Sequence, residues 1–147
     1  MHWLDSTPSR EIDPVLDCLT FLARRADRPS SPVLLRAGLA LSATGTLPFH
    51  QVEPALAQAG MRGEPLSRRR FAGWRLQQLP AIVELTEDRA IVLLEMKAGE
   101  ALIYAPGTAE PMWVPAGDIE PAFTGNAVVV EADPTQERAG ERPWDKI

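Results

Sequence analysis

The stretch that decides the fold is residues 81–105, "AIVELTEDRAIVLLEMKAGEALIYA". It holds three aliphatic and β-branched runs, at 81–86, 90–96 and 100–105, which are separated by the short breaks "EDR" and "KAG". Runs of this length and composition, joined by short turn-like breaks, are typical of antiparallel strands linked by hairpins. The stretch therefore predicts three neighbouring antiparallel strands.

The strand pattern continues on both sides of this stretch. Residues 111–115, "PMWVP", and 126–132, "NAVVVEA", are expected to be strands, with a short helix or turn between them. Upstream, "MRGEPLS" at 61–67 is expected to be a short strand, and "SRRRFAGWRLQQLP" at 67–80 a helical turn with a basic face.

Further toward the N-terminus the pattern becomes helical. Asp13 followed by Pro14 is a helix-start signal. Aspartate caps the free N–H groups of a first turn, and proline lacks only an N–H that has no partner there. Apolar residues then recur at helical spacing and predict a helix over about 13–26.

Two shorter helices are expected between this helix and the strands, over about 31–39 and 49–59. Pro54 lies inside the second one and weakens its pattern, because proline removes a helical hydrogen bond. Gly60 is the expected stop. Helices first and antiparallel strands second predict a single α+β domain.

The bulk composition restricts the class of protein. The chain has 147 residues, 45% hydrophobic and 24% charged, which fits one globular domain. Its net charge of −5 argues against nucleic acid as a partner, and its single cysteine excludes an internal disulfide and fits a reducing compartment. No apolar run approaches the roughly 18 residues of a membrane span, and residues 1–13 show no basic segment followed by an apolar one, so no secretion signal is expected. Residues 1–12 are interpreted as a tail and 132–147 as a linker.

The sequence contains no phosphate-binding GxxxxGK[ST] loop, no GxGxxG and no metal-ligand cluster, so no cofactor is expected. Its histidines are His2, in the tail, and His50, which is interpreted as a surface or capping residue. Cys18 falls beside Val15 and Leu22 on the apolar stripe, which favours a buried thiol. Spacing alone leaves a Cys18–His50 dyad open, because the fold brings catalytic residues together.

The order of four segments resembles the C39 peptidase-like domain, found at the N-terminus of ABC transporters in type I secretion systems. The segments are "DPVLDCLTFLARRADRPSSPVLLRAGLAL", "LPAIVELTEDRAIVLLEM", "ALIYAPG" and "EPAFTGNAVVV", and the match covers about 13–131. The resemblance implies a papain-like cysteine peptidase fold, with N-terminal helices packed on a C-terminal antiparallel β-sheet. Bacteriocin-exporting members cleave a double-glycine leader, whereas RTX-exporting members carry a degenerate copy that does not cleave.

This chain resembles the degenerate kind when the catalytic positions are matched one by one. The nucleophilic cysteine at the helix start falls on Pro14, and Cys18 takes the place of a second, structural cysteine. The histidine that opens a strand falls on Ala90, and the aspartate that closes the next strand falls on Ala105. No glutamine stands in "TPSRE", where the oxyanion-stabilising residue is expected. The resemblance therefore implies a domain that is not itself an enzyme, within a transporter that would be an ATPase.

The function implied is to bind or tether an unfolded RTX-type adhesin or toxin on the cytoplasmic side of the bacterial inner membrane. The substrate-binding candidates are Trp74, Tyr104, Trp113, Arg68, Arg69 and Arg70. The alternative interpretation of the three aromatic residues is packing in the core, and that of the three arginines is a solvated surface.

Two other functions stay open at the level of sequence. In the first of these functions, the domain is a structural or regulatory module that docks on the transmembrane or nucleotide-binding domains of its own transporter. In the other it is a cysteine peptidase that uses Cys18, which requires an exposed thiol of low pKa.

Overall fold

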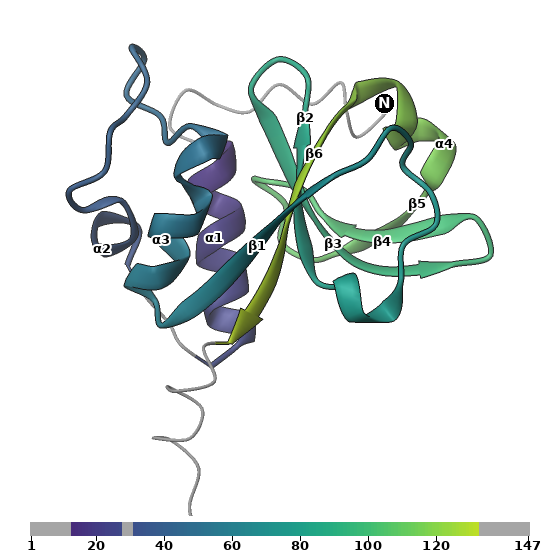
Figure 1. Cartoon of the computed structure of the whole chain (residues 1–147), viewed down its shortest axis with the longest axis horizontal. Coiled ribbons are helices and arrows are strands. Elements are labelled where there is room, and N and C mark those ends of the chain that lie inside the picture. Colours follow the sequence, from purple (N-terminus) through teal and green to yellow (C-terminus); the bar gives the residue numbers. More distant parts are fainter. Residues whose placement is uncertain (1–12, 28–30, 133–147) are drawn as a thin grey trace, which may run out of the picture.

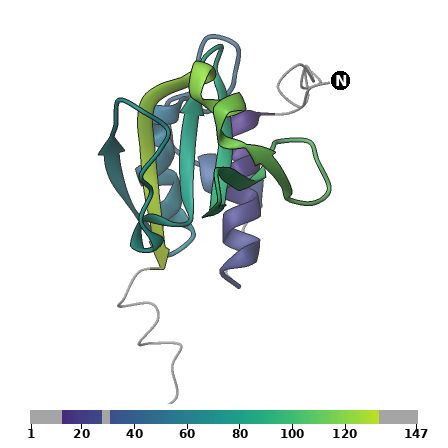
Figure 2. The same ribbon diagram turned by 90° about the vertical axis from the view of Figure 1, so that its right-hand side faces the viewer.

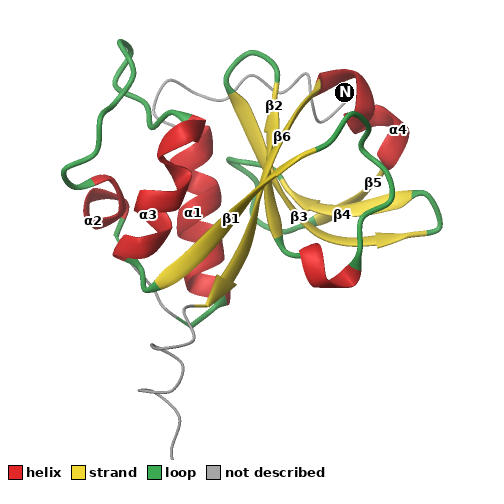
Figure 3. Ribbon diagram, in the orientation of Figure 1, coloured by secondary structure: helices red, strands yellow, loops and turns green. Residues whose placement is uncertain are grey.

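The computed structural model describes residues 13–27 and 31–132 (Figure 1). The expected tail at 1–12 lies outside the described residues, as does the expected linker apart from Ala132, which ends the last strand. Figure 3 shows helices gathered on one side of a twisted sheet, with shorter helical segments on its other side. This arrangement confirms the predicted α+β class.

The sheet has six strands in the order β1-β6-β2-β3-β4-β5, and all neighbouring pairs are antiparallel. Hairpins join β2 to β3 and β3 to β4, as the opening stretch predicts. The strands are β1 (Met61–Ser67), β2 (Ala81–Leu85), β3 (Arg89–Lys97), β4 (Glu100–Tyr104), β5 (Met112–Pro115) and β6 (Phe123–Ala132).

The last strand does not extend the series of hairpins. β6 returns to the other side of β2 and inserts between β1 and β2, as Figure 2 shows. It begins at Phe123, three residues before the predicted start, because Phe123 pairs with Leu85 beyond a register shift in β2. This insertion makes β1 and β5 the edge strands.

The helices begin where the sequence predicts, but the second is shorter. α1 (Pro14–Arg25) is capped by Asp13, and α2 (Pro32–Arg36) is capped by Ser31. α2 ends before the predicted Leu39, because Ala37 has an extended ψ and Gly38 a φ of +75°.

The predicted helix over 49–59 is a 3-10 turn, η2 (Phe49–Gln51), that continues into α3 (Val52–Gln58). Pro54 is the third residue of α3, where a backbone N–H has no helical partner to lose. Gly60 follows with a φ of +72°, which confirms it as the stop.

The basic segment does not form the predicted helical turn with a basic face. The segment contains a single turn, η3 (Leu76–Gln78), and Arg68–Arg70 lie before it. Arg68 continues the pairing of β1 through its backbone N–H, which donates to Gly125. The segment that joins β1 to β2 therefore crosses the sheet as a loop.

The two faces of the sheet each pack against a separate core. The face toward the helices packs against α1 and α3, with Ile82, Val92 and Val128 among its buried residues. The opposite face packs against the loop that carries Phe71 and against two short elements, α4 (Ala116–Ile119) and the 3-10 turn η4 (Glu120–Ala122).

Candidate binding cleft

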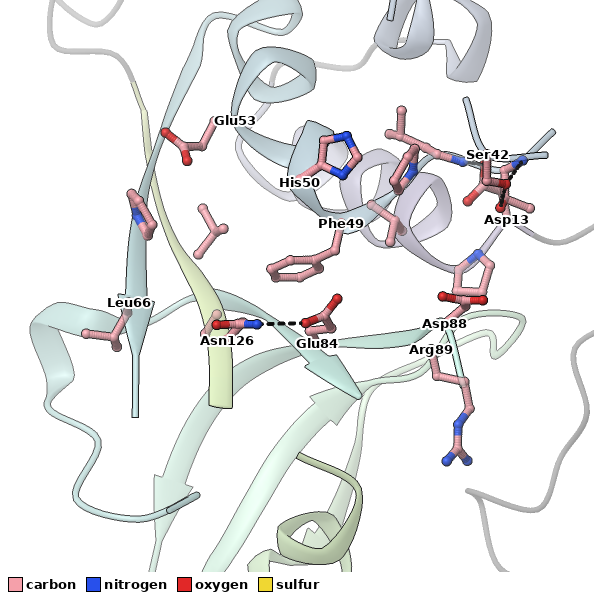
Figure 4. Close-up of a pocket in the computed structure, with 18 of the residues that line it drawn as sticks. Asp13, Ser42, Phe49, His50, Glu53, Leu66, Glu84, Asp88, Arg89 and Asn126 are labelled. Atoms are coloured by element: carbon pink, nitrogen blue, oxygen red, sulfur yellow. Dashed lines mark hydrogen bonds between the residues drawn. The ribbon is translucent and has the colours of Figure 1, made fainter. Parts of the chain in front are cut away.

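A cleft of about 500 Å³ opens where α1 begins. Its walls come from the start of α1, the loop before η2, the first turns of η2 and α3, and the sheet at β1, β2 and β6. Figure 4 shows Phe49 and His50 on one side of this space and Glu84 and Asn126 on the other. The cleft therefore lies between the helical part and the sheet.

Asp13 fixes the start of α1 at the edge of the cleft. One carboxylate oxygen accepts the backbone N–H of Leu16 at 3.4 Å, which caps the helix. The other accepts the backbone N–H of Leu47 at 2.7 Å, which ties the loop before η2 to the helix end. Pro14 is the first helical residue and lines the cleft.

Cys18 lies one helical turn beyond Pro14, and its side chain has 0% exposure in the helix-side core. Burial raises the pKa of the Cys18 thiol well above its usual range, and the charges of Asp17 and Asp13 raise it further. A nucleophilic cysteine needs the opposite, namely access and a stabilised thiolate. His50, by contrast, is exposed at the cleft. The prediction of a buried, space-filling thiol is confirmed.

We expect the folded domain to resist alkylation at Cys18. With iodoacetamide at pH 7.5, intact-mass measurement should find no adduct over hours under native conditions. Full labelling should appear within minutes in 6 M guanidinium chloride, because unfolding exposes the thiol. Rapid native labelling would restore Cys18 as a candidate nucleophile.

We also expect the stability of the domain to fall at alkaline pH. The folded-state pKa of Cys18 is raised, so its contribution is complete below an unfolded-state pKa of about 8.5 and is lost as pH rises above it. Urea unfolding between pH 7 and pH 9.5 should therefore show a steeper decline for the natural chain than for Cys18→Ala. Parallel declines in the two proteins would contradict this origin.

The positions matched to the other two catalytic residues are both buried. Ala90 lies at the start of β3 in the helix-side core, and Ala105 follows β4 in the core on the opposite face of the sheet. Neither lines the cleft, although Arg89 beside Ala90 does. Of the three matched positions, the structure brings only Pro14 to the cleft wall.

Tyr104 is packed inside the fold and is only 7% exposed. Its ring stacks on Phe21 with centroids 4.0 Å apart, and its hydroxyl donates to Asp17 at 2.7 Å. Burial raises the pKa of Tyr104 well above its usual range, and the hydrogen bond to Asp17 adds to this shift. Asp17 also accepts the backbone N–H of Gly107, so this group joins α1 to the end of β4.

Trp113 lies on the edge strand β5 and is 45% exposed. It pairs directly with Leu102, and residues opposite each other in an antiparallel pair share a face. Tyr104 lies two residues beyond Leu102 on the same strand. The two aromatic candidates therefore share the helix-side face of the sheet.

The other candidates lie over the opposite face. The guanidinium of Arg68 stacks 5.0 Å from the Trp74 ring, and it donates to Gln78 and to the backbone carbonyl of Ala72. Trp74 packs on Phe71 in the second core. Arg68 thus orders its own loop. The exposed candidates in this loop are Arg69 and Arg70.

The Trp74 side chain also carries a buried donor without a partner. Its Nε1 is the one buried side-chain nitrogen or oxygen without a hydrogen bond among residues 13–27 and 31–132.

The six substrate-binding candidates do not form one surface. Tyr104 and Trp113 share the helix-side face of the sheet, and the other four belong to the loop that crosses the sheet.

Residues of the cleft that the sequence interpretation missed are Phe49, Glu84 and Asn126. One signal was available for Glu84, which is the only charged residue within the aliphatic run "AIVELT". Phe49 and Asn126 carry no such signal, because their place depends on how distant segments meet.

Comparison with solved structures places this fold. The N-terminal peptidase C39-like domain of the toxin secretion ATP-binding protein from Vibrio parahaemolyticus is 26% identical, with a TM-score of 0.75 over 82% of this chain and 97% of that chain. A double glycine motif protease from an AMS/PCAT transporter, in complex with the leader peptide, is 17% identical, with a TM-score of 0.65 over 82% and 84%. The peptidase domain of Streptococcus ComA, a bifunctional ABC transporter of a quorum sensing pathway, is 15% identical, with a TM-score of 0.68 over 85% and 93%.

The chain has the papain-like α+β fold of C39 peptidase-like domains, which confirms the resemblance seen in the sequence. The first of these neighbours is a C39-like domain of a toxin secretion protein, and the other two, which are less than 20% identical, share the fold alone. No protein-family model and no curated protein sequence matches the chain. Within the described ranges, no helix is long and apolar enough to cross a membrane.

Proposed function

We propose that this domain binds a segment of the polypeptide exported by a secretion ABC transporter and does not cleave it. The supporting observation is the cleft at the start of α1, which is about 500 Å³ in volume and is lined by Pro14. The positive end of a helix suits a thiolate nucleophile, and proline supplies no such atom. The domain then holds its ligand on the cytoplasmic side of the inner membrane.

The ligand that the family resemblance suggests is an unfolded RTX-type adhesin or toxin. These polypeptides are rich in aspartate, so the exposed Arg69 and Arg70 offer complementary charge. Trp113 offers exposed aromatic surface to an unfolded chain. The less exposed candidates in this proposal are Arg68, Trp74 and Tyr104.

Titration of the ¹⁵N-labelled domain with a calcium-free, unfolded RTX repeat polypeptide tests this function. Amide shifts are expected near Arg69, Arg70 or Trp113, and they should disappear when calcium folds the repeats. Arg69→Glu with Arg70→Glu should weaken binding, whereas Arg62→Glu on β1 serves as the control. The absence of shifts at millimolar repeat polypeptide would contradict RTX binding by this domain.

The absence of cleavage is tested separately with a double-glycine leader peptide. Mass spectrometry after overnight incubation with the domain should find the peptide intact. Fragments ending at the double glycine, formed by the natural chain and lost in Cys18→Ala, would overturn the proposal in favour of a peptidase.

A second candidate function is docking on the transmembrane or nucleotide-binding domains of the same transporter. The observation that favours it is the exposed apolar surface of α2, where Val33 and Leu34 point into solvent. Docking requires no exported polypeptide. A transporter whose ATPase rate changes with Val33→Ser and Leu34→Ser, while RTX binding stays intact, would support this function.

A further inference from the structure

We infer that the cleft at the start of α1 binds a lysine or arginine side chain carried by an extended polypeptide. The inference rests on the proposed function, since it names the chemistry of the segment that the cleft would hold. It concerns a different surface from the arginine-bearing loop, which suits acidic repeats.

The charge of the cleft wall is the first step. Four carboxylates line the cleft, and they come from α1's cap, α3, β2 and the β2–β3 turn: Asp13, Glu53, Glu84 and Asp88. The arginine of the wall is Arg89, whose guanidinium donates to the backbone carbonyl of Thr86 at 3.0 Å and lies 3.7 Å from Glu87. Figure 4 shows this guanidinium directed away from the cleft. The space between the walls therefore favours a positive ligand.

Glu84 is held ready to accept such a ligand. Its Oε1 accepts the hydroxyl of Thr124 at 2.8 Å and the side-chain amide of Asn126 at 3.0 Å. Both bonds go to one oxygen, and they orient the carboxylate without neutralising its charge. The other oxygen retains acceptor capacity for an ammonium or guanidinium group.

Phe49 adds an aromatic face to this carboxylate. Figure 4 shows its ring on the side of the cleft that faces Glu84. A cation beside an aromatic ring and a carboxylate is attracted by both, by the ring quadrupole and by the full negative charge. Apolar side chains line the same cleft and can pack against the methylene stem of a lysine or arginine. They are Leu47, Pro65 and Val128.

The size and the donor set favour a side chain on a polypeptide over a metal ion. A volume of about 500 Å³ exceeds one side chain and fits several residues of an extended segment. No group of three or more metal-ligating side chains occurs among the described residues. Both oxygens of Asp13 already accept backbone N–H groups. The ligand is therefore an organic cation with an apolar stem.

The test uses three unstructured heptapeptides, Gly-Ser-Gly-X-Gly-Ser-Gly with blocked ends, in which X is lysine, norleucine or glutamate. The ¹⁵N-labelled chain is titrated with each peptide at low ionic strength. The lysine peptide should shift the amides of Phe49, Glu84 and Asn126, and the glutamate peptide should not. Added salt at about 0.5 M should weaken the binding of the lysine peptide, because screening reduces the electrostatic attraction.

Variants then connect the binding to the cleft carboxylate. Glu84→Gln keeps an oxygen for Thr124 and Asn126 but removes the charge. It should weaken the binding of the lysine peptide about fivefold. Glu100→Gln, on an exposed residue at the start of β4, is the matched control and should bind as the natural chain does.

Equal binding of the norleucine and lysine peptides would overturn the inference, as would unchanged binding by Glu84→Gln. If the RTX polypeptide binds while the lysine peptide does not, the inference fails and the proposed function stands. If the lysine peptide binds the cleft while the RTX polypeptide does not, the RTX assignment fails and the cleft specificity stands.

Discussion

Gly63→Ala is expected to lower the free energy of unfolding by about 3 kcal/mol. A Cβ at Gly63 would lie 2.5 Å from Cγ1 of Val128 and 2.7 Å from Cδ1 of Leu56. Both neighbours are buried in the helix-side core, so neither side chain can turn into solvent. Gly63 therefore allows α3, β1 and β6 to approach closely, and a methyl group forces them apart.

Urea unfolding followed by circular dichroism measures this loss. Gly117→Ala is the matched control, because nothing lies within 4 Å of its added Cβ and it stands in the short helix α4. There, alanine should be neutral or stabilising by up to about 1 kcal/mol. The double variant Gly63→Ala with Val128→Ala should lose less than the sum of the single losses, because the second change removes one of the clashing groups. Equal stability of the two glycine variants would show that the interface can open without cost.

The local parts of the fold were predictable from the sequence. Asp13 and Pro14 mark the start of α1 because capping chemistry acts within one turn. The runs within 81–105 give β2, β3 and β4 because hairpin strands follow one another along the chain. Gly60 ends α3 with a positive φ, which is again a local requirement.

The arrangement between distant segments was not predictable in this way. β6 pairs with both β1 and β2, and nothing in "FTGNAVVV" indicates its neighbours. Tyr104 is held by Phe21 and Asp17, which lie more than eighty residues earlier, so its burial has no local signal. Arg68 similarly acts on the ring of Trp74 rather than as part of a helical face.

Some features of the candidate cleft were likewise predictable from the sequence, and others were not. The proline at the start of α1 is visible in the sequence, and the structure adds that it lines the cleft. The opposing wall depends on β2 lying beside β6, which brings Asn126 to within 3.0 Å of Glu84. A glutamate in an aliphatic strand signals a special environment, but its partner is decided by strand order.

The second large effect is expected for Asp13→Ala, which should lower the free energy of unfolding by about 3 kcal/mol. Loss of the cap to Leu16 costs about 1 kcal/mol. The backbone N–H of Leu47, a buried residue, loses its carboxylate acceptor as well, and an unpartnered buried donor costs about 1–3 kcal/mol. The loop wall of the cleft should detach from the helix end at the same time.

Ser31→Ala is the matched control for Asp13→Ala, because Ser31 also caps a helix that begins with proline but accepts one N–H, that of Leu34, at an exposed site. Its loss should be about 1 kcal/mol or less. Urea unfolding gives both values, and hydrogen exchange at the Leu47 amide should accelerate in Asp13→Ala alone. If the two variants lose equal stability, the bond to Leu47 contributes nothing and the helix cap accounts for the whole effect. If the Asp13 variant loses the larger amount and also fails to bind the lysine peptide, the same carboxylate that stabilises the fold holds the cleft in its binding shape.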